Sequence, residues 1–110
     1  RLILNIAINY GSAASSCWPP APMRRMSHPG KRENDLDEQG FEQYLMTSGH
    51  PPVDLMIRTS GEQRLSNYLL WQLAYAEFYF TPVAWPDFHG EELRKAVEAY
   101  ENRDRRYGKV

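Results

Sequence analysis

The stretch that decides the fold is Asp54-Leu-Met-Ile-Arg58-Thr-Ser-Gly61-Glu62-Gln-Arg64-Leu-Ser66-Asn67-Tyr-Leu-Leu-Trp71-Gln-Leu-Ala-Tyr75-Ala-Glu77. Its first residues, 54–57, are a short apolar run that predicts a strand, and a polar loop over 58–66 follows. Ser66 is a favourable capping residue for a helix that we predict over 67–77, where apolar residues occur almost all round. A strand, a polar loop and a buried helix in this order are typical of an α/β layered domain with a parallel sheet.

The segments that precede this stretch fit the same architecture. Residues 2–9 are rich in Ile and Leu on both faces of a predicted strand, a composition typical of strands buried in parallel sheets. We therefore expect 2–9 and 54–57 to lie parallel in one sheet. Between them, acidic capping residues open the segment 35–45, which then places Phe41, Tyr44 and Leu45 at helical spacing.

The segments that follow the stretch continue the alternation of strands and helices. Residues 78–80 are aromatic and predict an extended segment, and either Asp87 or His89 precedes a last helix. We expect that helix to place its apolar residues Leu93, Ala96, Val97 and Tyr100 on one face. Acidic residues at its start and arginines at its end complement the helix dipole.

Composition limits the classes of protein to which the chain can belong. Its 110 residues suffice for one small domain, and 13 basic against 14 acidic residues favour no nucleic-acid partner. The single cysteine, Cys17, excludes an internal disulfide. No apolar run approaches the roughly 18 residues of a membrane span, and the first residues do not resemble a signal peptide. Because the chain starts within an apolar segment, we expect further sequence upstream.

The loop over 58–66 is the candidate site. Two arginines, three hydroxyl groups and a glycine follow the carboxyl end of a strand, the edge at which open α/β sheets bind ligands. Loop amides, a helix N-terminus and arginine forks together would hold a diphosphate. The alternative is a solvated loop in which Arg58 and Glu62 form a surface pair.

Four quoted segments carry a family resemblance: the run over 54–80, Trp85-Pro-Asp-Phe88, Asn102-Arg-Asp-Arg-Arg106-Tyr-Gly108 and Leu4-Asn-Ile-Ala-Ile-Asn9-Tyr-Gly11. They resemble signature blocks of the cis-prenyltransferase family, which includes undecaprenyl diphosphate synthase and isoprenyl transferase. The resemblance covers 2–11 and 35–108, which is far more specific than a short motif. It implies that 1–110 is the C-terminal part of a single α/β domain.

The resemblance implies a role for each matched residue. The residues implied to bind the diphosphate of isopentenyl diphosphate are Arg58, Arg64, Ser66, Arg106 and Gly108, with Asn9 and Glu62 in support. Glu77 is implied to bind Mg²⁺, and a Glu on a buried helix would need either a metal or a basic partner. The alternatives are a solvent-facing Glu77, a structural Glu62 and a frayed helix end at Arg106. The aromatic residues nearby are expected mostly in the core: Trp71, Tyr75, Phe78, Phe80 and Trp85.

The implied reaction is the condensation of isopentenyl diphosphate with an allylic prenyl diphosphate to a cis-polyprenyl diphosphate. The family further implies a homodimer in the cytoplasm, with at most peripheral membrane contact through its lipid product. The family's aspartate-containing block for the allylic diphosphate is not present, so we expect the isolated chain to be inactive. Two other functions stay open: a non-catalytic partner subunit of a heteromeric prenyltransferase, and a nucleic-acid binder that uses the basic tail over 103–109.

Residues 12–29 depart from the family's pattern. With four prolines and little periodicity, they are typical of a flexible connection. GC-rich codons for 13–23 would give Arg-Glu-Leu-Val in a shifted reading frame, which is the family's helical pattern. We therefore hypothesise a frame-shifted segment that returns to frame near Gly30, a hypothesis that the nucleotide sequence would decide.

Overall fold

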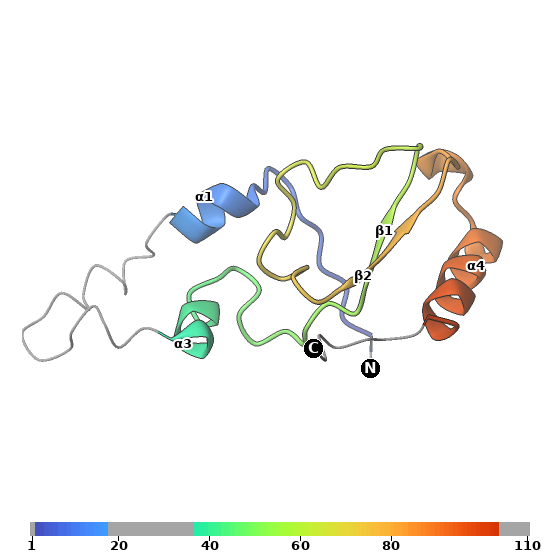
Figure 1. Cartoon of the computed structure of the whole chain (residues 1–110). Coiled ribbons are helices and arrows are strands. Elements are labelled where there is room, and N and C mark those ends of the chain that lie inside the picture. Colours follow the sequence, from blue (N-terminus) through green and yellow to red (C-terminus); the bar gives the residue numbers. More distant parts are fainter. Residues whose placement is uncertain (1, 18–36, 104–110) are drawn as a thin grey trace, which may run out of the picture. The chain divides into compact units, whose positions relative to one another are not determined.

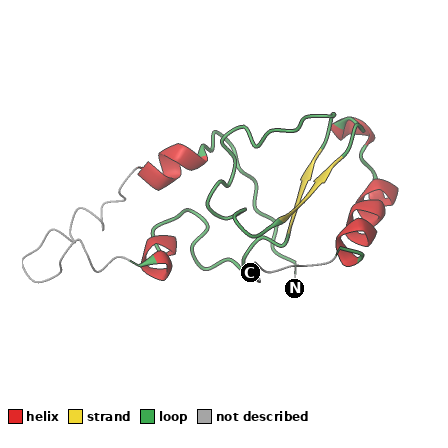
Figure 2. Ribbon diagram, viewed as in Figure 1, coloured by secondary structure: helices red, strands yellow, loops and turns green. Residues whose placement is uncertain are grey.

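The computed structural model describes residues 2–17 and 37–103 of the chain. The elements in these ranges are the helices α1 (Ser12–Cys17), α3 (Glu38–Glu42) and α4 (Gly90–Glu101), the strands β1 (Leu55–Arg58) and β2 (Glu77–Phe80), and a 3₁₀ helix at Trp85–Asp87 (Figures 1 and 2). The chain divides into two compact units. We call the described residues 2–17, 37–52 and 66–71 the amino-terminal unit, and 53–65 and 72–103 the sheet unit.

A parallel pair of strands forms the centre of the sheet unit. Leu55 pairs with Glu77 and Arg58 pairs with Phe80. Backbone hydrogen bonds extend the ladder at both ends, since the Glu77 amide donates to Asp54 and the Thr81 amide donates to Arg58. The predictions of an α/β class with a parallel sheet and of an extended segment at 78–80 are confirmed.

The prediction that residues 2–9 and 54–57 lie parallel in one sheet is wrong, because the sheet that the described residues form contains two strands, β1 and β2. Residues 2–9 form no strand and have no sheet partner among the described residues. Their Leu and Ile side chains are exposed, with Leu2 at 93% of its full accessibility. A strand is stable only beside a hydrogen-bonded neighbour, so β-forming composition alone does not fix one.

The predicted helix over 67–77 is also absent, since turns occupy 66–75 and β2 starts at Glu77. Ser66, Asn67 and Leu69 have φ angles of 50°, 59° and 48°, which lie in the left-handed region that a right-handed helix excludes. The backbone and side chain of Asn67 are engaged elsewhere in the amino-terminal unit. Its main-chain oxygen accepts from the Ser12 amide and its Oδ1 accepts from the Ala13 amide, both at 2.7 Å. Such bonds offer the backbone an alternative to the helix.

The amino-terminal unit contains the helix predicted near 35–45 in shortened form. Asp37 caps α3, because its side chain accepts a hydrogen bond from the Gly40 amide at 2.7 Å. Tyr44 and Leu45 lie in turns beyond the helix, and Leu45 is buried. Of the atypical stretch 12–29, residues 12–17 form α1, and 18–29 lie outside the described residues.

Helix α4 confirms the predicted last helix and packs against β2 in the sheet unit (Figure 1). Of the four apolar residues that we expected on one face of this helix, Ala96 is fully buried, whereas Leu93 and Val97 remain largely exposed. The core of this unit also contains Met56, Leu73 and Thr81. None of the helices in the described ranges has the length and apolar character needed to cross a bilayer.

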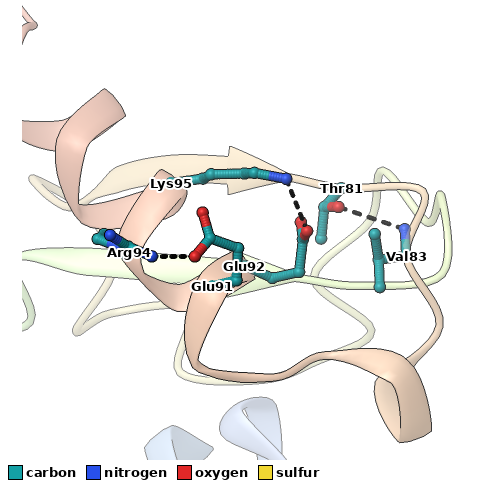
Figure 3. A network of polar contacts seen from close by, with 6 residues as sticks. All are labelled: Thr81, Val83, Glu91, Glu92, Arg94 and Lys95. Carbon is teal, nitrogen blue, oxygen red and sulfur yellow. Dashed lines mark hydrogen bonds and ion pairs between the residues drawn. The ribbon is translucent and has the colours of Figure 1, made fainter.

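Two ion pairs form within α4, each between residues three positions apart (Figure 3). Glu91 pairs with Arg94, and Glu92 accepts a hydrogen bond from Lys95 at 2.8 Å. The Glu92 bond and charge raise the pKa of Lys95. Such exposed pairs three residues apart support the helix by only about 0.2–0.5 kcal/mol each.

The aromatic residues expected in the core are less buried than predicted. Tyr75 is 92% exposed and Trp85 is mostly exposed, and Trp71 and Phe80 are partly exposed. Phe78 is half-buried and contacts Phe80 edge-on. The prediction of a mostly buried set therefore fails, because the helix that would have buried Trp71 and Tyr75 is replaced by turns.

The buried position of Ala96 yields a stability prediction. Ala96→Leu should lower the free energy of unfolding by about 1–3 kcal/mol, because the larger side chain overpacks the contact between α4 and β2. Urea denaturation followed by circular dichroism measures this change. Val97→Leu, an enlargement at an exposed position of the same helix, is the matched control and should be nearly neutral. Equal effects of the two substitutions would contradict the described packing.

Candidate functional site

The candidate loop starts at the carboxyl end of β1. Arg58 is the last residue of that strand and is half-buried. The chain then turns sharply, since Ser60 and Gly61 have φ angles of 63° and 68°. Strand pairing therefore fixes Arg58, while two successive left-handed residues direct the loop away from the strand.

The amides at the start of this loop are used inside the sheet unit. Ser60 donates to the Val83 carbonyl at 2.8 Å, and Gly61 donates to the Thr81 carbonyl at 2.9 Å. These bonds hold the loop against the segment that follows β2. The amides of Ser60 and Gly61 therefore do not face a phosphate as expected, and the helix whose N-terminus was expected to do so is replaced by turns.

Glu62 pairs with Arg64 within the loop. Arg64 Nε lies 2.7 Å from Glu62 Oε2, and the Arg64 side chain is 72% exposed. This contact does not itself occupy the terminal amino groups of the guanidinium, which form the fork that matches a phosphate. The loop therefore carries three predicted residues, Arg58, Glu62 and Arg64, and the last two form an ion pair.

Glu77 lies at the other end of the sheet. It is the first residue of β2 and pairs with Leu55, three residues before Arg58. Three residues of strand span about 10 Å, so the structure does not bring the Glu77 and Arg58 backbones together. The prediction that Glu77 lies on a buried helix is wrong, because Glu77 lies at the amino end of β2.

Arg103 is the partner of Glu77. Its Nη1 donates to Glu77 Oε2 at 2.6 Å, and its Nη2 donates to the Phe78 carbonyl at 2.7 Å. The sequence indicated that a Glu here needs a metal or a basic partner, but it assigned Arg103 only to the helix dipole. Because 26 residues separate the pair, spacing along the chain does not reveal it.

The remaining predicted residues belong elsewhere. Asn9 and Ser66 are in the amino-terminal unit, both with left-handed φ angles, of 55° and 50°. Ser66 takes part in a polar or ring contact, so it is not a vacant hydroxyl. Arg106 and Gly108 lie outside the described residues.

The residues present fit magnesium in one limited way. Among the described residues, no three His, Cys, Asp or Glu side chains gather as a metal cage would require. Mg²⁺ commonly takes only one or two protein carboxylates and fills its remaining positions with water and substrate phosphate oxygens. The single carboxylate of Glu77 is compatible with that mode. It does not suffice for a site in which the protein supplies every ligand.

Comparisons with known proteins agree on one family. A family model described as putative undecaprenyl diphosphate synthase matches residues 1–108. An isoprenyl transferase of Clostridium perfringens is 47% identical over 99% of this chain and 44% of its own length. A ditrans,polycis-undecaprenyl-diphosphate synthase ((2E,6E)-farnesyl-diphosphate specific) of Haemophilus influenzae is 47% identical over 97% of this chain and 45% of its own length.

A solved structure shows the same relationship. The crystal structure of lavandulyl diphosphate synthase from Lavandula x intermedia, in complex with dimethylallyl diphosphate, aligns with a TM-score of 0.83 and 42% identity. The alignment covers 92% of this chain and 44% of that structure. The chain therefore spans less than half the length of the proteins that it matches.

The turn at Gly61 yields a prediction about the candidate loop. Gly61→Ala should lower the free energy of unfolding by about 1–2 kcal/mol, since its φ of +68° is unfavourable for any residue with a Cβ atom. Gly90→Ala is the control, because Gly90 starts α4 and its φ is not positive. No atom lies within 4 Å of either added Cβ, so only the backbone differs. Chemical denaturation should show Gly90→Ala neutral or stabilising, and a destabilisation equal to that of Gly61→Ala would contradict the turn.

Proposed function

Because the chain belongs to the undecaprenyl diphosphate synthase family of cis-prenyltransferases, we propose that it carries the isopentenyl diphosphate half-site of such an enzyme. The whole protein would condense isopentenyl diphosphate with an allylic prenyl diphosphate and form a cis-polyprenyl diphosphate. The proposal rests above all on one observation, the loop from Arg58 to Arg64 at the carboxyl end of β1, where Glu62 forms an ion pair with one of two arginines.

The chemistry explains why two arginines suit this loop. In the condensation, the allylic carbon–oxygen bond breaks and diphosphate leaves, while the isopentenyl double bond forms the new carbon–carbon bond and a proton is lost. The isopentenyl diphosphate is not the leaving group, so its diphosphate serves to place the nucleophilic carbon. Arg58 and Arg64 would bind and orient that diphosphate, with Ser66, Arg106 and Gly108 as further contacts and Asn9 in support.

Glu77 would hold Mg²⁺ as the single protein carboxylate. When bound, the ion supplies positive charge that offsets the charge of a diphosphate. Glu77 is the first residue of β2, and its side chain is 30% exposed, so a partly solvated ion could reach it. Its distance from Arg58 along the sheet means that the two side chains would act on different parts of the bound group.

The proposal extends to the assembly and its location. We expect a homodimer in the cytoplasm, with peripheral membrane contact only through the lipid product. Exposed apolar side chains at Leu2, Leu4, Ile6 and Ile8 support a protein partner, because a contiguous exposed apolar segment is typical of interaction surfaces.

The first functional prediction concerns substrate binding. Arg58→Ala and Arg64→Ala should each weaken the binding of isopentenyl diphosphate by about tenfold or more, because charge-assisted hydrogen bonds contribute roughly 1.5–3 kcal/mol. Isothermal titration calorimetry measures the Kd. Arg94→Ala, which removes an exposed arginine from α4, is the matched control and should leave the Kd unchanged. Wild-type affinity in both loop variants would remove the basis for the proposed half-site.

The second functional prediction is that the 110-residue chain alone does not turn over. Residues that match the family cover the isopentenyl diphosphate side, and a second diphosphate needs its own cationic groups. The rate should fall by far more than the tenfold that about 1.4 kcal/mol represents. The assay combines the purified chain with radiolabelled isopentenyl diphosphate, farnesyl diphosphate and Mg²⁺, with an intact isoprenyl transferase as the positive control. Turnover near that of the control would show that these residues suffice.

A further inference from the structure

The contact between Arg103 and Glu77 joins the two main elements of the sheet unit. Arg103 follows Asn102, the C-cap residue of α4, and Glu77 starts β2. One guanidinium donates to the Glu77 carboxylate at 2.6 Å and to the Phe78 carbonyl at 2.7 Å. Because two donors of a planar group bind two consecutive residues of one strand, the guanidinium is fixed in position and in plane.

This contact differs from the other ion pairs of the unit. Glu91–Arg94 and Glu92–Lys95 are each formed within one turn of α4. The Arg103–Glu77 contact spans 26 residues of sequence, and the two side chains are 41% and 30% exposed. The carboxylate of Glu77 is thus held by a residue distant in sequence that is itself bonded a second time, to the Phe78 carbonyl, and this restricts its orientation.

The bond engages one carboxylate oxygen in particular. Arg103 binds Oε2, so the orientation of the remaining oxygen, Oε1, follows from that bond. Hydrogen-bond partners of this kind behind a metal ligand orient it, and their removal commonly lowers metal affinity about 10–100-fold. We propose that Arg103 is a positioning residue for cation binding: it holds Oε2 of Glu77 so that Oε1 is presented to Mg²⁺. This inference rests on the proposed function of Glu77.

Repulsion between the guanidinium and the cation acts in the opposite direction. Both side chains are in partial contact with water, whose high dielectric constant reduces that repulsion. The orientation imposed by two short hydrogen bonds is not screened in this way. The second bond, to the Phe78 carbonyl, also keeps Arg103 in place whatever the carboxylate binds. Orientation should therefore dominate, and loss of Arg103 should weaken cation binding.

The test measures cation binding by the whole chain, without turnover. The probe is Mn²⁺, followed by electron paramagnetic resonance in the presence of inorganic pyrophosphate. Glu77→Gln and Arg103→Ala should each raise the Kd for Mn²⁺ about tenfold or more. Arg103→Lys should recover part of the loss, since it keeps a charged donor without the fork. Arg94→Ala, which removes an arginine of α4 that also pairs with a Glu, should bind as wild type does.

A double variant separates positioning from a merely structural role. If Arg103 acts through Glu77, then Glu77→Gln combined with Arg103→Ala should bind Mn²⁺ no more weakly than Glu77→Gln alone. Additive losses would mean that Arg103 acts independently of Glu77, which overturns the inference. Circular dichroism checks the fold of each variant. If Arg103→Ala does not fold, the same comparison with Arg103→Lys decides the question.

The remaining outcomes distinguish the inference from the function on which it rests. Unchanged Mn²⁺ affinity in Glu77→Gln would overturn both the metal role of Glu77 and the inference. Weak binding in Glu77→Gln together with wild-type or tighter binding in Arg103→Ala would overturn the inference alone. Failure of the diphosphate half-site itself is detected separately, in the affinity of Arg58→Ala and Arg64→Ala for isopentenyl diphosphate.

Discussion

The parallel pairing of β1 with β2 is the constraint on which the sheet unit depends. Parallel neighbours cannot be joined by a tight hairpin, so the chain must return over residues 59–76 before β2 starts. The register then fixes Arg58 at the carboxyl end of the pair and Glu77 at the amino end. Arg58 and Glu77 therefore lie at opposite ends of the paired strands. An ion pair of Glu62 with Arg64 follows Arg58 in the loop, and Arg103 contacts Glu77.

At both ends of the strand pair, a carboxylate side chain contacts an arginine. At the carboxyl end, hydrogen bonds within the sheet unit use the amides of Ser60 and Gly61, and Glu62 forms an ion pair with Arg64. At the amino end, Arg103 fixes the Glu77 carboxylate. Each end thus combines a carboxylate with an arginine. At the carboxyl end Glu62 contacts the guanidinium of Arg64, and at the amino end Arg103 holds the carboxylate of Glu77.

The crossover shows how one residue can redirect a segment with strong helical character. Residues 67–77 have the composition of a buried helix, yet Asn67 bonds to the Ser12 and Ala13 amides through its main-chain and side-chain oxygens. A Cβ atom added at Gly11 would lie 2.9 Å from Asn67 Nδ2, so this close approach needs glycine there. Contacts between residues more than fifty positions apart therefore decide the local conformation of this segment. They outweigh its intrinsic helix propensity.

The sequence by itself determined the family, the α/β class, the strand near 54–57, the extended segment at 78–80 and the helix that follows His89, because these depend on local pattern and on long matching blocks. It also singled out the loop with Arg58 and Arg64. Only the tertiary structure decided which strand pairs with β1, why 67–77 is not a helix, and that Arg103 is the partner of Glu77. The physical reason is that strand neighbours, the hydrogen bonds of Asn67 and a salt bridge across 26 residues are long-range pairings, and no local periodicity encodes them.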